Sequence, residues 1–315
     1  METHELYHEG ERRVQQRTGE ELTAARNSRA ISDAMIPGAV SFIQNQTMAV
    51  AGSVDRDGNT WASLLLGEPG FTRVADERTL EIDLERAGSH AADPLWSSLD
   101  ANPKVGLLFI ELASRRRFRV NGEIQAASAN RLQLSVTEAY PNCPQYIQRR
   151  QVKVSASNNM EQIHTAHHNG DELTAAQQAL IGSADTFFVA SVHPGRGADA
   201  SHRGGDPGFV RVIDQHTLRV PDYPGNGMFN TLGNFEVYPK AGLAFLDLQR
   251  GRILQLTGEA SIRWDLEEQP QLPTGGTGRY WDFKIARWIE ADLDYRLTSD
   301  FLDAWPRNPA AKQRD

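Results

Sequence analysis

The sequence contains a single cysteine, Cys143, among its 315 residues. An internal disulfide and a cysteine-rich zinc site are therefore excluded. No apolar run approaches the roughly 20 residues that a membrane-spanning helix needs. The polar N-terminal stretch also lacks the apolar segment of a secretory signal. These absences predict a cytoplasmic protein that is not embedded in a membrane.

The sequence also lacks an extended basic block. Its formal charge is −8 and its pI is about 5.6. Nucleic acids and anionic membrane surfaces attract basic patches, so we expect neither as a partner. The one local exception is Arg115-Arg116-Arg117 with Arg119, which lies between two strand-like runs. We interpret it as a solvated turn.

Short strand-like runs joined by Gly and Asp turns make up most of the chain. Residues 47–54 and 60–66, for example, flank the hairpin-type turn Asp55-Arg56-Asp57-Gly58. Helices are expected within the charged residues 1–30, after Pro37, and over residues 171–182. The pattern predicts a mainly β fold, a β-barrel with flanking helices.

The pattern occurs twice. Residues 68–74 (EPGFTRV) match residues 206–212 (DPGFVRV), an offset of 206 − 68 = 138. Residues 102–107 (NPKVGL) match residues 238–243 (YPKAGL), an offset of 238 − 102 = 136. Agreement in order and spacing predicts one β-domain duplicated in the chain, forming an internal pseudo-dimer.

The repeat suggests a division of the chain into five parts. They are an N-terminal helical and polar segment (1–34), a first barrel domain (35–154), a linker (155–172), a second barrel domain (173–300) and a tail (301–315). The linker contains His164, His167 and His168, and His4 and His8 stand four residues apart near the start. We interpret both sets as solvated and predict no metal site.

The stretch from Ser201 to Asn234 is the richest in binding chemistry. Gly and Asn tolerate positive φ and allow backbone N–H groups to converge on a ligand. Arg203 and the neighbouring hydroxyls add the groups that bind phosphate. The alternative is an ordinary β-meander whose turns are rich in Gly and Asn.

Taken together, these motifs resemble the pyridoxamine 5′-phosphate oxidase-like FMN-binding split barrels, and most of all their tandem-domain branch. The resemblance spans roughly residues 35–265. It is carried by residues 61–65 (WASLL), 142–148 (NCPQYIQ) and 228–234 (MFNTLGN), besides the repeated motifs above. It implies two tandem split barrels, FMN as cofactor, and an oxidoreductase acting on a small molecule.

The resemblance also implies cofactor-binding residues. On the phosphate side these are Ser201, Arg203, Gly204, Gly205, Asn226, Asn230 and Thr231. On the side of the flavin ring they are Trp61, Ser63, Asn142, Gln145 and Tyr146. Asn230 and Thr231 stand where the oxidases of the family have a basic pair. The corresponding loop of the first copy, residues 85–96, lacks the Asn-rich chemistry and carries acidic groups that would repel phosphate, so we expect one FMN per chain.

The sequence leaves the reaction open, and no residue is identified as catalytic. Electrons would come from NAD(P)H or a separate reductase. A non-catalytic flavin carrier or sensor, a scaffold with a decayed pocket, and a barrel using deazaflavin or haem are the alternatives. Cys143 is interpreted as a packed cysteine. The chain is expected to be a monomeric pseudo-dimer or a homodimer.

Overall fold

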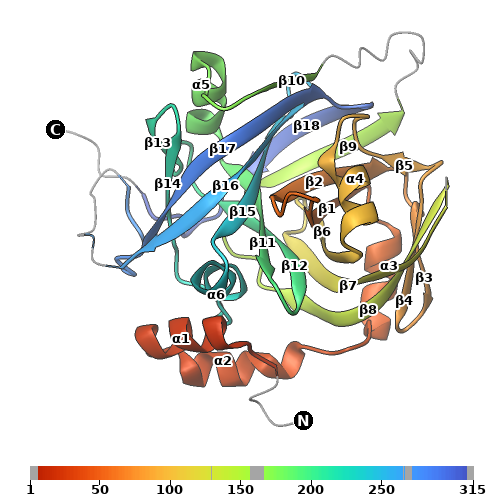
Figure 1. The fold of residues 1–315 in the computed structure, drawn as a ribbon, viewed down its shortest axis with the longest axis horizontal. Helices are drawn as coiled ribbons and strands as arrows, with labels where there is room; N and C mark the ends of the chain where they lie inside the picture. Colours follow the sequence, from red (N-terminus) through yellow and green to blue (C-terminus); the bar gives the residue numbers. More distant parts are fainter. Residues whose placement is uncertain (1–5, 129, 157–166, 265, 267–271, 311–315) are drawn as a thin grey trace.

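Two antiparallel sheets with the same strand order form the two halves of the molecule (Figure 1). The computed structural model describes residues 6–128, 130–156, 167–264, 266 and 272–310. The first sheet contains β1 (Met48–Val54), β2 (Thr60–Gly67), β3 (Thr72–Asp76), β4 (Thr79–Asp83), β5 (Ala87–Gly88), β6 (Lys104–Glu111), β7 (Arg116–Ser128) and β8 (Arg131–Asn142). The second contains β10 (His167–Gly170), β11 (Thr186–His193), β12 (Gly197–Gly204), β13 (Arg211–Asp214), β14 (Thr217–Pro221), β15 (Lys240–Asp247), β16 (Arg252–Arg263) and β17 (Tyr280–Asp292).

The strand orders confirm the duplication. The first sheet runs β3-β4-β8-β7-β6-β1-β2, followed by the short β5. The second runs β13-β14-β17-β16-β15-β11-β12, with β10 added at β17. Each strand of one path thus has a counterpart at the same place in the other. The predicted fold class, two tandem split barrels, is confirmed.

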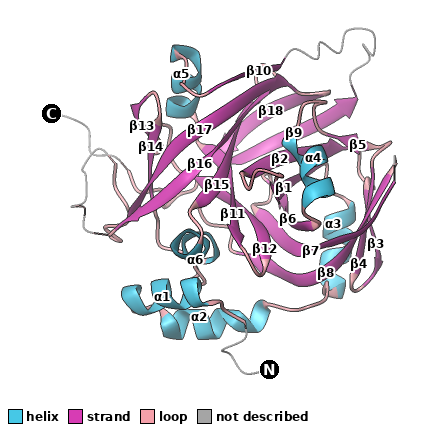
Figure 2. Ribbon diagram, in the orientation of Figure 1, coloured by secondary structure: helices cyan, strands magenta, loops and turns pink. Residues whose placement is uncertain are grey.

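Helices flank the sheets, as Figure 2 shows. They are α1 (Glu9–Thr18), α2 (Glu21–Asn27), the 3₁₀ turn η1 (Ser28–Ala30), α3 (Pro37–Gln44), α4 (Pro94–Ala101), α5 (Ala175–Ser183) and α6 (Asn230–Val237). The three predicted helical regions are confirmed. Pro37 occupies the first turn of α3, and Thr174 caps α5 in a capping box with Gln177. In Figure 1, α1 and α2 lie beside α6 at one end of the molecule.

Two strands differ from the sequence expectation. Residues 167–170, assigned to a linker, form β10 and pair with β17, although His167 and His168 remain exposed. The alternation over residues 280–291 predicts a last strand, but β18 (Tyr295–Asp303) follows β17. β18 pairs with β9 (Arg149–Ala156) in a separate two-stranded sheet. A strand that follows the first barrel thus pairs with one that follows the second.

The halves join through a core of their own. Each barrel has one cluster of buried apolar residues, and a third cluster contains residues of both, including Val50, Leu64, Leu108, Phe188 and Ala244. Small residues let the backbones approach within this contact. A Cβ at Gly242 of β15 would lie 2.6 Å from the carbonyl oxygen of Thr60 and the Cα of Trp61 in β2.

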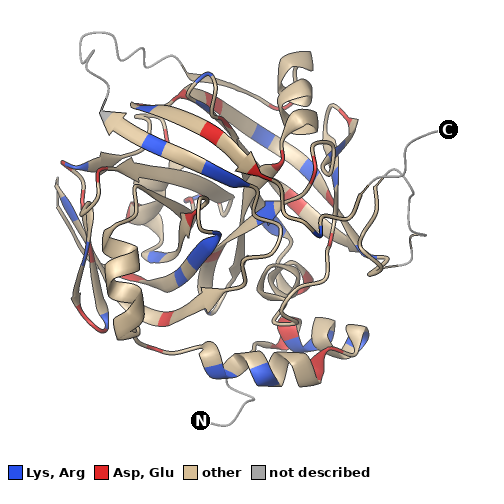
Figure 3. Ribbon diagram, turned by 180° about the vertical axis from the view of Figure 1, so that it is seen from behind, with Lys and Arg blue, Asp and Glu red and all other residues tan. Residues whose placement is uncertain are grey.

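The surface chemistry is mixed. Figure 3 shows Lys and Arg interspersed with Asp and Glu on both halves. No helix within the described residues has the length and apolarity required to traverse a bilayer.

We predict that Gly242→Val separates the two halves. Its side chain would meet backbone of β2, which cannot rotate away, so we expect a loss of unfolding free energy of about 1–3 kcal/mol or more, as for other overpacked sites. Urea unfolding of the full chain measures it. Gly182→Ala in α5 is the control, because no atom lies within 4 Å of the added Cβ and alanine favours a helix. Equal stability of the two variants would contradict the close contact.

Candidate functional site

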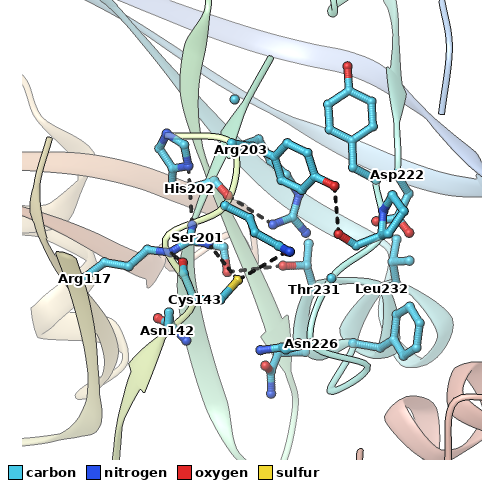
Figure 4. Close-up of a pocket in the computed structure, with 18 of the residues that line it drawn as sticks. Arg117, Asn142, Cys143, Ser201, His202, Arg203, Asp222, Asn226, Thr231 and Leu232 are labelled. Carbon is cyan, nitrogen blue, oxygen red and sulfur yellow. Dashed lines mark hydrogen bonds between the residues drawn. The ribbon is translucent and has the colours of Figure 1, made fainter. Parts of the chain in front are cut away.

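A cavity of about 130 Å³ lies between the two halves. Its walls come from β7 and residues 142–146 of the first half, and from β12, residues 221–229 and the start of α6 in the second (Figure 4). Most predicted residues meet here. Those that line the cavity are Asn142, Gln145, Tyr146, Ser201, Arg203, Gly204, Asn226, Asn230 and Thr231.

Three predicted residues do not line it. The N–H of Gly205 donates to the carbonyl oxygen of Asp185, directly behind the wall. Trp61 and Ser63 are fully buried elsewhere in the contact between the halves. A ring contact from either of them is therefore not supported by the geometry.

Two arginines that the sequence assigned to a solvated turn line the cavity instead. Arg117 and Arg119 lie in β7, and Arg119 is only 3% exposed. Arg119 donates to the hydroxyls of Tyr140 and Ser201 and lies 3.3 Å from the carboxylate of Asp199. Burial opposes the charge, but Asp199 and the other partners outweigh it and raise the pKa of Arg119. The alternation of Arg117 and Arg119 along one strand was the signal for a shared face.

Two guanidinium groups at the cavity, those of Arg117 and Arg203, have no carboxylate within ion-pair distance among the described residues, although Asp222 acts on Arg203 from further away. Asp222 lines the same cavity, but its carboxylate pairs with Arg279 at 2.9 Å. Burial lowers the pKa of Arg203 to about 10 and also lowers that of Arg117. Such cations are costly unless an anion accompanies them.

The start of α6 adds uncharged donors. Its first backbone hydrogen bond runs from the Gly233 N–H to the Phe229 carbonyl oxygen, so the preceding N–H groups of the helix have no helical acceptor. Phe229 occupies the N-cap with φ 61° and offers no side-chain cap. Thr231 Oγ1 lies 3.3 Å from Ser201 Oγ. An uncapped helix start is favourable for a negative group.

Several polar atoms at the cavity lack partners within the described residues. They include Nε2 of His202, Oδ1 of Asn142 and Nε of Arg119. His202 is 3% exposed, and burial together with Arg117 and Arg203 keeps its pKa well below the usual range. It is therefore a neutral imidazole. Buried polar groups are normally satisfied, so these atoms are unfavourable unless water or another polar group contacts them.

Two tyrosine rings also line the cavity. The rings of Tyr146 and Tyr223, one from each half, are 4.8 Å apart, and the hydroxyl of Tyr146 donates to the carbonyl oxygen of Pro224. Tyr146 has φ 63°, an unusual conformation for a residue other than glycine. Cys143 is not packed in a core as expected: it is half-buried, and its sulfur lies 3.5 Å from Nη2 of Arg117.

The equivalent position in the other half is filled by the protein itself. Strand registers place Ser63 where Ser201 stands, and Gln255 where Arg119 stands. There the carboxylate of Asp93 accepts from Ser63, Ser89 and Gln255, and also from the backbone N–H of Leu95. Asp93 thereby caps α4, the counterpart of α6.

The cations are also absent from that equivalent position. Leu65 replaces Arg203, Ile253 replaces Arg117 and Gln255 replaces Arg119 in the matching registers. Moreover, residues 143–148 separate β8 from β9, whereas residues 293–294 alone separate β17 from β18. The structure thus contains one open cavity with excess positive charge and one closed counterpart that holds its own carboxylate.

A third group of side chains has the composition of a metal site. Within the described residues, ligand atoms of His8, Glu9 and His193 lie within 4.8 Å of one another. His8 is buried and caps α1, contrary to the solvated position predicted for it, whereas His4 lies outside the described residues. Nδ1 of His8 accepts from the Gly10 N–H, and Nδ1 of His193 accepts from that of Gly195. Each Nε2 of a neutral ring therefore carries the hydrogen, which opposes metal binding there.

Comparison with known proteins gives one family match. Residues 35–156 match the family model described as pyridoxamine 5′-phosphate oxidase. A search of curated proteins gives no match.

Among solved structures, HupZ from Group A Streptococcus is 17% identical, with 44% of this chain and 99% of that chain covered and a TM-score of 0.28. A protein from Clostridium acetobutylicum, related to general stress protein 26 of B. subtilis and assigned to the pyridoxinephosphate oxidase family, is 11% identical, with coverages of 39% and 89% and a TM-score of 0.25. MrkH of K. pneumonia, in complex with c-di-GMP, is 9% identical, with coverages of 82% and 87% and a TM-score of 0.20. At such low similarity, the ligands of those proteins say nothing about what this chain binds.

We predict that Asp93→Ala destabilises the protein. The change removes the cap of α4 and leaves buried hydroxyl and amide donors without an acceptor, so we expect a loss of about 2 kcal/mol or more. Thermal unfolding measures it. The control is Asp33→Ala, which removes an exposed ion pair with Arg78 that is worth at most about 1 kcal/mol. A melting curve of Asp93→Ala that matches the wild type would show that this carboxylate does not hold the closed position together.

Proposed function

We propose that the chain is a flavoprotein that binds one FMN in the open cavity between its halves. The premise is that residues 35–156 match the pyridoxamine 5′-phosphate oxidase-like split-barrel family. The closed counterpart beside Asp93 supports a single site. Most of the residues expected from the sequence line the open cavity, and they come from both halves.

The observation that carries the proposal is the uncompensated charge. Arg119 and Arg279 pair with carboxylates, whereas Arg117 and Arg203 form no ion pair with any carboxylate in the described part of the chain. A phosphate monoester carries a charge of about −1.5 to −2 at neutral pH and offers three acceptor oxygens. It therefore matches both the charge of the pair and the free donors at the start of α6.

The residues present fit the phosphate end of a flavin nucleotide. Arg203 and Arg117 would pair with its oxygens, and Ser201 and Thr231 would add hydroxyl donors. Sites for whole small molecules usually exceed about 300 Å³, whereas the cavity measures about 130 Å³. The ring system therefore needs further room at the mouth, where Tyr146 and Tyr223 meet.

We propose an oxidoreductase activity with a small-molecule substrate. Bound FMN would supply the hydride or electron chemistry, while the protein binds, orients and shields it. Neutral His202 offers an uncharged ring nitrogen at the cavity, which the two tyrosines also line. Reducing equivalents would arrive from NAD(P)H or a separate reductase.

A non-catalytic flavin carrier or sensor is the second candidate. It is favoured by the chemistry of the wall, where the cations are arginines and the pKa of His202 lies far from neutrality. No lining group with a resolved pKa shift is thus tuned to exchange a proton near pH 7. A deazaflavin with a phosphate would present the same anion as FMN, whereas haem would present carboxylates.

We predict that the full chain binds FMN with a stoichiometry of one, read from the visible flavin absorbance during titration. Two flavins per chain would contradict the closed state of the second position. If the protein gains no flavin absorbance, the scaffold function is favoured. If the purified protein shows the spectrum of haem or of a deazaflavin, that cofactor takes the place of FMN in the proposal. Anaerobic stopped-flow with NADH and NADPH then separates the two functions, because a carrier is reduced by neither.

We predict that Arg203→Ala weakens FMN binding by about 1–3 kcal/mol, the range for hydrogen bonds that involve a charge. Fluorescence titration measures the affinity, and riboflavin, which lacks the phosphate, should bind both proteins equally. The control is Arg250→Ala, an exposed arginine in the turn between β15 and β16. Unchanged FMN affinity in Arg203→Ala would place the phosphate elsewhere.

A further inference from the structure

A second cavity, of about 270 Å³, lies next to the first, and Asn230 lines both. It is enclosed by the start of α1, strands β6 to β8, the turn between β11 and β12, and α6. Asp199 of β12 faces it, 8% exposed. Apart from Asn230, none of the residues inferred to hold a flavin phosphate, Arg203 included, belongs to this second lining.

The duplication explains why this space is open. Asp199 occupies the position that Trp61 occupies in the first half, as the matching strand registers show. Trp61 is fully buried, its Nε1 donates to Asp55, and the guanidinium of Arg287 lies 5.1 Å from its ring. A large ring therefore fills one half, whereas a short carboxylate leaves a cavity in the other.

Four acidic side chains from different parts of the chain line the cavity, and one of them, Glu123, lies beside Lys104. Glu11 lies in α1, Glu138 in β8 and Asp199 in β12. Asn121 joins two of them, because its Nδ2 donates to Asp199 at 2.6 Å and to Glu138 at 3.2 Å. Glu11 accepts from Asn230 at 2.6 Å.

An unpartnered acceptor stands among these acids. Oδ1 of Asn121 has no hydrogen-bond partner within the described residues, and Asn121 is 9% exposed. The orientation of the Asn121 amide is fixed, because its Nδ2 donates to both Glu138 and Asp199. An oxygen left free beside carboxylates calls for a ligand that donates hydrogens.

Other charged groups face the same cavity. Lys104 donates to the carbonyl oxygen of Gly195 and lies 3.8 Å from Glu123. Arg196 donates to the carbonyl oxygen of Leu6.

The two histidines complete the wall of the cavity. Nε2 of His8 lies 3.5 Å from a carboxylate oxygen of Glu11, and Nε2 of His193 lies 3.4 Å from one of Glu9. Burial, with a contribution from His193, lowers the pKa of His8 to about 4, so His8 is neutral. Once Glu11 and Glu138 are ionised, the four lining carboxylates outnumber Lys104, Arg196 and Arg119, which pairs with Asp199 from the neighbouring cavity.

We propose that this second cavity is a binding site for a small organic amine, whose ammonium group donates to Asn121 Oδ1, Glu138 and the neighbouring carboxylates. An ammonium carries three N–H donors and one positive charge, which suit the free Oδ1 of Asn121 and the ionised carboxylates beside it. A single metal ion fits less well, because Glu11, Glu138 and Asp199 do not form a group whose ligand atoms lie within 4.8 Å of one another. The site is separate from the flavin proposal and does not depend on it.

Amine binding at this site should depend on pH, because it is linked to the ionisation of Glu11 and Glu138. Burial raises the pKa of Glu11 to about 8, and burial with Asp199 raises that of Glu138 to about 7. A bound cation favours the ionised carboxylates and so lowers both pKa values, which releases protons. Amine binding should therefore strengthen as pH rises through this range, while the amine itself stays charged up to about pH 10.

Isothermal titration of the full chain with n-butylamine tests the proposal, with n-butanol as the neutral counterpart. We expect butylamine to bind about tenfold or more tightly at about pH 8.5 than at about pH 6, with proton release seen as a heat that depends on the buffer. Glu138→Gln should remove at least about nine-tenths of the affinity at the higher pH. Because glutamine resembles the protonated acid, the variant should fold as the wild type does near pH 6.

Controls make the outcome decisive. Glu259→Gln alters an exposed glutamate of β16 and should leave the affinity unchanged. Glu11→Gln, a second lining variant, should reduce proton release as Glu138→Gln does. The proposal is overturned if butylamine binds no more tightly than butanol, if Glu138→Gln and Glu11→Gln both keep wild-type affinity, or if CaCl₂ or MgCl₂ binds there and butylamine does not.

Discussion

The close contact between the two halves is the constraint on which the rest of the structure depends. Gly106 faces the backbone of Ala198 and Asp199, and its counterpart Gly242 faces that of Thr60 and Trp61. Side chains there would hold the sheets apart. Because the backbones meet, β7 of the first half can place its arginines beside β12 of the second. Both cavities lie along this contact, so neither exists within one barrel alone.

Much of the fold follows from the sequence because its determinants are local. Alternating strands, Asp-Gly turns and a motif repeated at a constant offset are all read along the chain, and the matching strand orders confirm them. The loop from Ser201 to Asn234 was recognised for the same reason. The role of Arg117 and Arg119 was missed, since each contacts a side chain of β12 that lies more than 80 residues further along the chain. Arginine in a strand next to a turn looks solvated until the partner sheet is known.

The loop around Asp93 was predicted to lack Asn-rich chemistry and to repel phosphate through its acidic groups. The structure shows in addition that the carboxylate of Asp93 occupies the closed position as a hydrogen-bond acceptor. A helix start and a buried serine need an acceptor whether or not a ligand is present. Asp93 supplies that acceptor for α4, in the place where α6 leaves its donors free. The sequence could not reveal this, because the donors of Ser63 and Gln255 are distant from Asp93 in the chain and meet it only after folding.

Duplication within one chain permits this asymmetry. In a homodimer of identical barrels, any residue of one site recurs in the other, so Arg119 and Gln255 could not occupy equivalent positions. Covalent tandem copies remove that restriction, and one half can close while the other stays open. The same freedom placed Trp61 opposite Asp199. Asp199 pairs with Arg119 at the first cavity and accepts from Asn121 at the second. The presence of aspartate rather than tryptophan at this one position therefore affects the charge of both cavities.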